Sequence, residues 1–139
     1  MKHIVFATDG SESSDRAGEM ARDYLQAWPE AKLTVLYVTA RENYTYDLVS
    51  EAVDQHEAKV AEQIKANMVD HLFEAWKDRV EFVHEVGHPS STICRVGREK
   101  DADLIIVGSH GRGFIDRAIV GSVARAVLNR THLPVLVAR

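Results

Sequence analysis

The sequence has little of what would tie it to a disulfide framework, a membrane or a nucleic acid. Its single cysteine, Cys94, cannot form an internal disulfide, and the apolar, helix-like surroundings STICRVGRE favour a buried side chain over a reactive thiol. No segment approaches the ~18 consecutive apolar residues of a membrane-spanning helix, and the opening MKHIVFATD lacks the apolar region of a signal peptide. The net charge of −4 argues against a nucleic-acid partner. We therefore expect a soluble, cytoplasmic protein.

The 139 residues fit a single domain, 1–139, which is large enough to bury a core without disulfides or metals. Five short runs rich in β-branched residues are typical of strands, and several are nearly continuous in apolar residues, as in parallel strands covered on both faces. The runs span residues 3–9, 32–38, 79–86, 103–109 and 133–139. The third run instead alternates apolar with charged residues, which predicts a half-exposed strand near a sheet edge.

Between the strands, apolar residues recur at the three- and four-residue spacing of helices. The predicted helices span residues 11–28, 47–77, 89–100 and 121–132. Ser11 or Ser13 is the expected N-cap of the first, and Pro89 opens the third. The second is one long helix or two abutting ones. Strands that alternate with helices predict an α/β fold: one open parallel sheet with right-handed crossovers and helices on both faces.

In such a sheet, ligands bind beyond the carboxyl ends of the strands, where the strand order reverses. The segments at these ends are ATDGS (7–11), YVTA (37–40), EVGHP (85–89) and GSHGRG (108–113). The last opens the stretch GSHGRGFIDRAIVGS, residues 108–122, which is longer than the ordinary connection of about two to six residues. This stretch is therefore the first candidate for a binding site.

Three familiar motifs fail in their structural context. HEVGH, residues 84–88, matches a zinc-protease signature that requires a helix, but here it ends a predicted strand. In a strand the two histidines would lie roughly 13 Å apart, at ~3.3 Å per residue, too far to share one zinc ion. The lysine of a phosphate-binding loop is replaced by Phe114, and the third glycine of the dinucleotide fingerprint by Asp116.

The glycine-rich stretch nevertheless suits a phosphate. Its candidate residues are Gly108, Ser109, His110, Gly111, Arg112, Gly113, Gly121 and Ser122. The first three glycines permit positive φ and exposed N–H groups, which can form an anion-binding nest. Gly121 and Ser122 open the last helix, whose N-terminal N–H groups and dipole favour a phosphate. The two serines add hydroxyl donors, and His110 or Arg112 adds charge. Two interpretations stay open: a phosphate or nucleotide site, or glycines that serve only tight turns.

Asp9 is the candidate metal ligand. A carboxylate at the end of the first strand, beside Thr8 and Gly10, can hold Mg²⁺ bound to a polyphosphate. The alternative is that Asp9 caps the first helix. No pairing of a nucleophile with a base is evident, and the G-x-S-x-G elbow is absent because residues 108–112 read GSHGR. No catalytic residue is therefore assigned.

These motifs resemble those of the universal stress protein family. Gly108, Gly111, Gly121 and Ser122 fit its G-x₂-G-x₉-G-[ST] pattern. The resemblance covers the whole chain: HIVFATDGSESS is similar to the family's first strand and turn, and VGHPSSTI to its strand-to-third-helix junction. ADLIIVGSHGRG is similar to its fourth strand and phosphate loop, and VARAVLNRTHLPVLVAR to its closing helix and strand.

The resemblance implies a Rossmann-like sheet of five parallel strands in the order 3-2-1-4-5, usually in a homodimer. It also implies binding of ATP, or of AMP, because this chain carries the complete glycine pattern of the binding members. Asp9 matches a residue that faces the phosphates or metal, Ala7 and Thr8 line the same wall, and the Val38 backbone matches an adenine contact. The positions that match the ribose and phosphate surroundings are Gly108, His110, Gly111, Gly121, Ser122 and Val123. Gly10, after Asp9, departs from the family and puts the metal geometry in doubt.

Dimerisation also has a basis in the residues. LPVLVAR closes the sequence, and an apolar strand at a sheet edge is an aggregation hazard unless it pairs. Pairing with a second copy about a two-fold axis closes that edge. Val135 and Val137 are the candidates for this contact.

Taken with the resemblance, the sequence predicts an adenine-nucleotide-binding protein that acts as a homodimeric sensor or regulator in the stress response, with ATP or AMP bound and Mg²⁺ alongside. The first alternative is a slow ATPase in the same pocket, for which Asp9 beside a metal is the one candidate base. The second alternative is a dimer that binds no nucleotide and acts through protein contacts.

Overall fold

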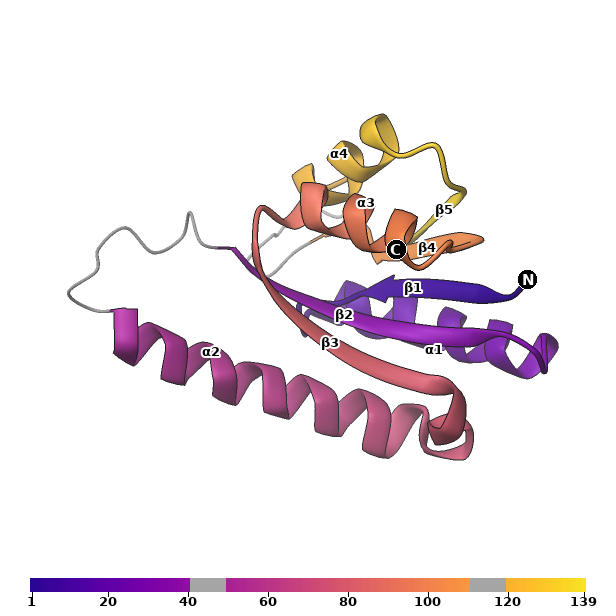
Figure 1. The fold of residues 1–139 in the computed structure, drawn as a ribbon, viewed down its shortest axis with the longest axis horizontal. Helices are drawn as coiled ribbons and strands as arrows, with labels where there is room; N and C mark the ends of the chain where they lie inside the picture. Colours follow the sequence, from indigo (N-terminus) through magenta and orange to yellow (C-terminus); the bar gives the residue numbers. More distant parts are fainter. Residues whose placement is uncertain (41–49, 111–119) are drawn as a thin grey trace.

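The computed structural model describes residues 1–40, 50–110 and 120–139. Its centre is a five-stranded parallel sheet in the order β3-β2-β1-β4-β5 (Figure 1). The strands are β1 (His3–Ala7), β2 (Lys32–Ala40), β3 (Val80–Gly87), β4 (Leu104–Gly108) and β5 (Val135–Ala138). The predicted α/β class, parallel sheet and strand order are all confirmed.

Helices cover both faces of the sheet (Figure 1). They are α1 (Glu12–Ala27), α2 (Ser50–Lys65), α3 (Pro89–Glu99) and α4 (Ser122–Arg130). Buried side chains of α1 and α2 pack on one face, and those of α3 and α4 on the other. The strands supply both layers because their side chains alternate: Ile4 and Phe6 of β1 join the first layer, and Val5 between them joins the second.

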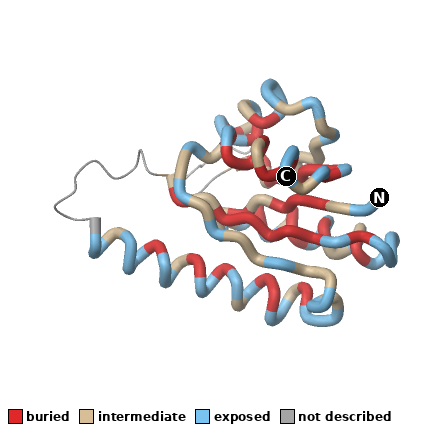
Figure 2. The backbone as a smooth tube through the Cα atoms, viewed as in Figure 1, coloured by how far each residue is buried: buried red, intermediate tan, exposed pale blue. Residues whose placement is uncertain are grey.

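The position of each strand in the sheet explains its composition. β1 and β4 lie inside the sheet and are almost wholly buried, whereas β3 lies at an edge and is half-exposed (Figure 2). This confirms the edge strand predicted from the alternation in RVEFVHEV. Cys94 is buried in the second layer, and burial raises the pKa of its thiol, which fits the predicted role as a small apolar residue.

The long helix predicted over 47–77 begins within the described residues as α2 and then changes its winding. The chain widens into a π-helical segment, η3 (Ala66–Leu72), and tightens into a 3₁₀ segment, η4 (Glu74–Arg79). The wider turns keep Met68 and Val69 buried, and Phe73 is fully buried between the two segments. The sequence left open one long helix or two abutting ones, and the described residues form the α-helix α2 followed by two segments of different winding.

Helix α1 begins with an ordered cap. The Ser11 hydroxyl accepts a hydrogen bond from the Ser14 N–H at 3.3 Å, so Ser11, rather than Ser13, is the N-cap. Just before it, Asp9 Oδ1 accepts from the Ser11 N–H at 2.9 Å, and Gly10 takes a positive φ of 81°. The glycine is required here because this turn adopts the left-handed region.

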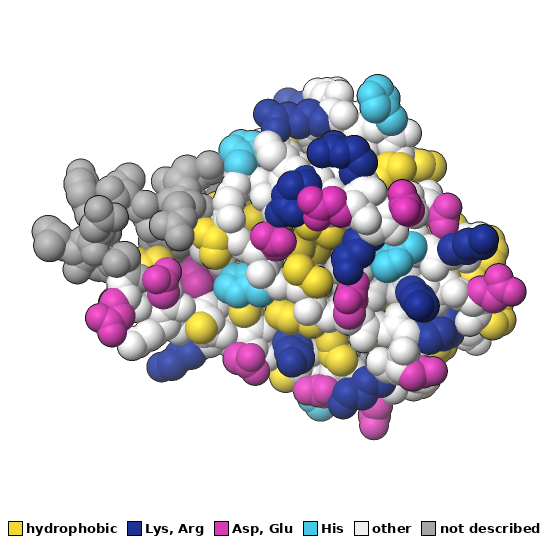
Figure 3. Space-filling model, viewed as in Figure 1, with side chains coloured by type: hydrophobic (Ala, Val, Ile, Leu, Met, Phe, Trp, Pro, Cys, Tyr) yellow, Lys and Arg dark blue, Asp and Glu magenta, His cyan; other side chains and the backbone are white. Residues whose placement is uncertain are grey.

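The surface and the helices add two observations. On the face shown in Figure 3, the basic and acidic side chains of the described residues are interspersed, so this face presents no extended basic surface. Among the described residues, no helix combines the length and the apolar composition that crossing a membrane would require.

Candidate functional site

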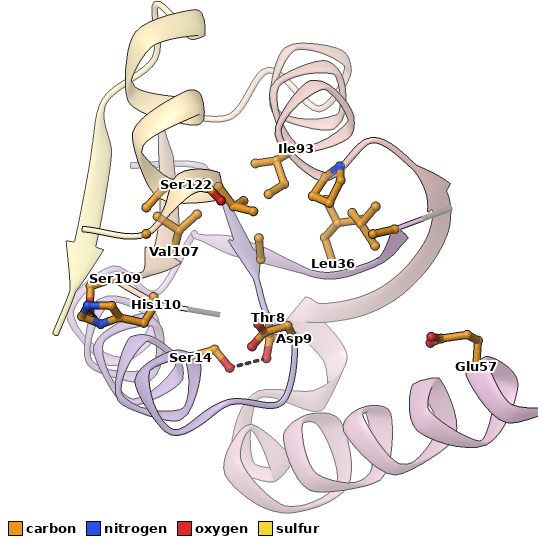
Figure 4. A pocket seen from close by; sticks show the side chains of 18 residues that line it. Thr8, Asp9, Ser14, Leu36, Glu57, Ile93, Val107, Ser109, His110 and Ser122 are labelled. Atoms are coloured by element: carbon orange, nitrogen blue, oxygen red, sulfur yellow. Dashed lines mark hydrogen bonds between the residues drawn. The ribbon is translucent and has the colours of Figure 1, made fainter. Parts of the chain in front are cut away.

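A cavity of about 310 Å³ opens at the carboxyl ends of β1, β2 and β4, where the strand order reverses (Figure 4). Ten of the residues predicted for the site line it: Ala7, Thr8, Asp9, Val38, Gly108, Ser109, His110, Gly121, Ser122 and Val123. The other three, Gly111, Arg112 and Gly113, lie outside the described residues. The described part of the predicted site is thus one contiguous surface.

The end of β1 forms the floor of the cavity. Thr8 is buried, and its hydroxyl lies 2.9 Å from the Ser14 hydroxyl of α1 (Figure 4). Its backbone N–H donates to Leu36 O at 2.9 Å, which ties β1 to β2 just past the last paired residue of β1. Asp9 follows at the cavity wall. Because its Oδ1 holds the Ser11 N–H, the carboxylate has a fixed orientation.

The end of β4 is held by backbone contacts rather than by an open nest. The Ser109 N–H donates to Ala138 O at 2.7 Å, and the His110 N–H donates to Ser13 Oγ at 3.1 Å. Gly108 does not have a positive φ, since Gly10 is the only glycine with one in the described part of the chain. The described start of the predicted anion-binding nest therefore does not present the N–H groups of Ser109 and His110 to the cavity, because both are engaged inside the protein.

The first turn of α4 supplies N–H hydrogen-bond donors to the cavity, which the end of β4 does not. Gly121 is the N-cap, and its N–H donates to Ser109 O at 2.6 Å. No side chain within the described residues caps this helix. The next three residues, Ser122, Val123 and Ala124, all line the cavity, and the first N–H groups of a helix have no partner within it. The positive end of the α4 dipole therefore faces the cavity.

Another part of the wall is apolar. It consists of Leu36, Val38 and Ala40 from β2, Pro89 and Ile93 from α3, and Val107 from β4. Of these residues, the sequence assigned only Val38 to the site, although Ala40 and Pro89 lie in segments that it placed at the strand ends. Pro89 and Ile93 were recognised as helix residues, but nothing in a helical pattern shows that the first turn of that helix faces a cavity. One signal was available: α3 starts directly after β3. Because the carboxyl ends of parallel strands lie at the same edge of a sheet, the first turn of such a helix lies near the cavity.

Glu57 of α2 is the residue of the wall that the sequence missed most clearly. Glu57 is buried, whereas its neighbour His56 is exposed. The buried positions are Glu57, Ala61, Ile64 and Met68, whose spacing of four, three and four is that of one helix face, so Glu57 belongs to the inward face of the helix.

The Glu57 carboxylate is fixed by the end of β2. The Tyr37 hydroxyl donates to Glu57 Oε2 at 2.5 Å, and the Thr39 hydroxyl donates to the same oxygen at 3.3 Å. Thr39 also lies 2.7 Å from His84 Nε2 of β3, and the His84 ring stacks on Tyr37. Buried carboxylates are rare unless they are paired in this way.

The histidines of HEVGH do not share a helix. His84 lies in β3 and contacts Thr39, whereas His88 lies beyond the strand as the N-cap of α3, with its Nδ1 3.2 Å from the Ser90 hydroxyl. The segment is therefore a strand end, as predicted. In the described part of the chain, no three His, Cys, Asp or Glu side chains are grouped to hold a metal.

Acidic side chains gather around the start of α1, beside the cavity. Burial raises the pKa of Asp15, and the negative charges of Asp9, Glu19 and Glu12 raise it further. Of these four carboxylates, Asp9 is the one that lines the cavity.

A sequence model of the universal stress protein family matches residues 1–139. The chain belongs to this family. A putative universal stress protein of Staphylococcus saprophyticus is 32% identical over 147 residues, which cover 99% of this chain and 83% of the relative. Membership confirms the resemblance read from the glycine pattern.

Solved structures of the family have the same architecture. The universal stress protein UspA of Lactobacillus plantarum matches with a TM-score of 0.87 and 23% identity, over 99% of this chain and 97% of that chain. A universal stress protein in complex with cAMP matches with a TM-score of 0.69 and 28% identity, over 99% of this chain and 96% of that chain.

Proposed function

We propose that this universal stress protein binds an adenine nucleotide, ATP or AMP, in the cavity at the carboxyl ends of β1, β2 and β4. The observation that carries the proposal is the first turn of α4, whose residues line a cavity that also has an apolar wall, so that its N-terminal N–H groups are available to a phosphate. A relative that is 28% identical was solved with cAMP, an adenine nucleotide. The protein would act in the cytoplasm as a homodimeric sensor or regulator of the stress response.

Each wall of the cavity suits one part of the nucleotide. The N–H groups of Ser122 and Val123 would bind phosphate, with the Ser122 hydroxyl as a further donor. The base would lie against Val38 and Ile93, on the apolar wall. Arg112 and the glycines at 111 and 113 remain candidates that lie outside the described residues.

Mg²⁺ would accompany the phosphates at Asp9. Magnesium is commonly held by one or two protein carboxylates together with substrate phosphates, so a single carboxylate at the cavity wall fits such an ion. Asp9 meets this requirement because it lines the cavity and its carboxylate is oriented by the Ser11 N–H. The ion would neutralise charge on the phosphates and favour ATP over AMP.

Calorimetry on protein freed of carried-over nucleotide tests the proposal. We expect ATP or AMP to bind with a Kd near 1 μM, about −8 kcal/mol. Ser122→Asp places a carboxylate in the first turn of α4, which favours the helix but repels a phosphate, and it should weaken binding about tenfold or more. Ser91→Asp makes the same change in the first turn of α3, on an exposed residue that does not line the cavity, and should leave binding unchanged.

Two results would count against the proposal. Wild-type protein that binds neither nucleotide would point to the alternative of a dimer that acts through protein contacts. Equal affinity in wild type and Ser122→Asp would mean that the phosphate lies elsewhere. Steady ATP turnover that is lost in Asp9→Asn would favour the slow ATPase instead.

A further inference from the structure

The Glu57 carboxylate lines the cavity although the cavity is proposed to bind an anion. The residue is 5% exposed, and its Oε2 accepts hydrogen bonds from the hydroxyls of Tyr37 and Thr39. Tyr37 is itself fully buried. A carboxylate that accepts two hydroxyl hydrogen bonds on one oxygen is held in one orientation.

Glu57 and the phosphate-binding end lie apart. Figure 4 shows the carboxylate of Glu57 reaching from α2 toward the cavity, on the other side of the view from Ser122, with Asp9 and Leu36 between them. Backbone N–H groups at α4 attract negative charge, and the Glu57 carboxylate repels it. The cavity therefore has one end for an anion and another end that rejects one.

A carboxylate only accepts hydrogen bonds, so the ligand group it favours is a neutral donor, either a hydroxyl or an amino group. A nucleotide offers such groups on its ribose and its base. A second phosphate brought to the same place would meet a buried negative charge in a medium of low polarity, where repulsion is strong. Acidic residues in dinucleotide-binding sites make the same distinction, accepting a hydrogen bond from a ribose hydroxyl where a basic residue would bind a 2′-phosphate.

We propose that Glu57 is a specificity-determining residue of the cavity: it accepts a hydrogen bond from the neutral nucleoside part of the ligand and excludes a second phosphate from that end. The inference rests on the proposed nucleotide binding. Tyr37 and Thr39 act as positioning residues, since they hold the carboxylate without themselves lining the cavity. The site then selects nucleotides that are phosphorylated at one position.

The experiment compares three probes by calorimetry: AMP, adenosine 2′,5′-bisphosphate and adenosine 3′,5′-bisphosphate. We expect wild-type protein to bind AMP more than about tenfold tighter than at least one bisphosphate. Glu57→Gln keeps the shape of the side chain and an oxygen that can accept from Tyr37, but removes the charge, so this preference should fall to within about threefold. Glu62→Gln, an exposed residue of the same helix outside the cavity, is the matched control and should keep the full preference.

Tyr37→Phe provides a second variant should Glu57→Gln fail to fold. It keeps the buried ring and removes only the hydroxyl, and we expect it to reduce the preference for AMP because the carboxylate loses its shorter hydrogen bond. Wild-type protein that binds AMP and both bisphosphates equally would overturn the role of Glu57 but leave nucleotide binding intact. An unchanged preference in Glu57→Gln would do the same. Wild-type protein that binds none of the probes would overturn both proposals.

Discussion

Gly108, the last residue of β4, packs directly on Ser13 in the first turn of α1. A methyl group on its Cα would lie 2.5 Å from the Ser13 hydroxyl oxygen and 2.9 Å from the Ser13 carbonyl carbon. The same hydroxyl donates to His110 O at 2.9 Å. The close approach therefore aligns α1 with the loop that lines the cavity.

Gly108→Ala should destabilise the protein by about 1–3 kcal/mol, because the added methyl group cannot fit without moving α1 away from β4. The free energy of unfolding in urea measures the effect, and nucleotide affinity should fall with it since the cavity wall moves. Ser13→Ala in the same chain should not restore stability, because the methyl group would also meet the Ser13 backbone.

Gly87→Ala is the comparison for this substitution. Its added methyl group would meet only the Thr92 hydroxyl, at 3.1 Å, and a side-chain hydroxyl can rotate away. The loss of stability should therefore be smaller than for Gly108→Ala. Equal losses in the two variants would show that the contact with α1 is not the reason that position 108 is glycine.

The architecture could be predicted from local patterns because the order of apolar and polar residues in a segment shows which of its faces are buried. Apolar runs marked the inner strands, and the alternation from Val80 to Val86 marked the edge strand. Ser11 and Pro89 marked the starts of two helices. The strand order was different: it came with the family resemblance, since periodicity shows that strands are parallel but not which of them are neighbours.

The site was predictable where it lies at strand ends and helix starts, and less so elsewhere. Glu57 was missed because a charged residue on a helix is ordinarily solvated, and its burial depends on Tyr37 and Thr39, partners from another element. Gly108 was expected to supply positive φ, but its role is close approach to Ser13. Both errors concern tertiary contacts, which composition and spacing do not contain.

Arg79 should prove important for stability because it caps a helix to which it does not belong. Its guanidinium donates to the carbonyls of Leu25, Trp28 and Ala31, at 3.1, 3.1 and 2.7 Å, at the end of α1. Lysine cannot reproduce this fork of donors, so Arg79→Lys should cost about 2 kcal/mol in the free energy of unfolding.

The matched control is Arg22→Lys on α1 itself. Arg22 lies 3.8 Å from Asp23 with both side chains well exposed, and such pairs contribute little. We expect a change within about 0.5 kcal/mol. A loss as large as that of Arg79→Lys would mean that replacing arginine by lysine is costly even without the three carbonyls, and would contradict the role given to Arg79.

Stability should fall in mild acid because of His3. Burial lowers the pKa of His3 below its ordinary value of 6.5, against the raising effect of Glu81. The unfolded chain then binds more protons than the folded protein between the folded pKa and 6.5, so the free energy of unfolding decreases as the pH falls through that window. The slope from one group cannot exceed about 1.4 kcal/mol per pH unit.

His3→Gln should remove this part of the pH dependence, since glutamine can still bond the Thr34 hydroxyl that lies 2.7 Å from His3 Nε2. Urea unfolding at pH 5 and pH 7 measures the change. A second decrease in the free energy of unfolding, below pH 4.5, should remain in the variant. Hydrogen bonding to Lys100 lowers the pKa of Glu81, so protonation of Glu81 at low pH removes the stability that its ionised form contributes. Identical profiles in wild type and variant would contradict the assignment to His3.

The proposed dimer can be tested at the outer edge of β5. The N–H groups of Ile105 and Ser109 donate to the carbonyls of Pro134 and Ala138, so residues 134, 136 and 138 turn their backbone groups toward β4. Because these directions alternate along a strand, the backbone groups of Val135 and Val137 point to the open edge.

Val137→Pro should therefore give a monomer without breaking the sheet. Proline removes an outward N–H that only a second chain would use, and edge strands tolerate proline at such positions. Light scattering should report twice the chain mass of 15.6 kDa for wild type and 15.6 kDa for the variant. Leu128→Ala, which removes an apolar side chain 46% exposed on α4, should remain a dimer. A dimeric Val137→Pro would place the interface elsewhere, because no strand could then pair at that residue.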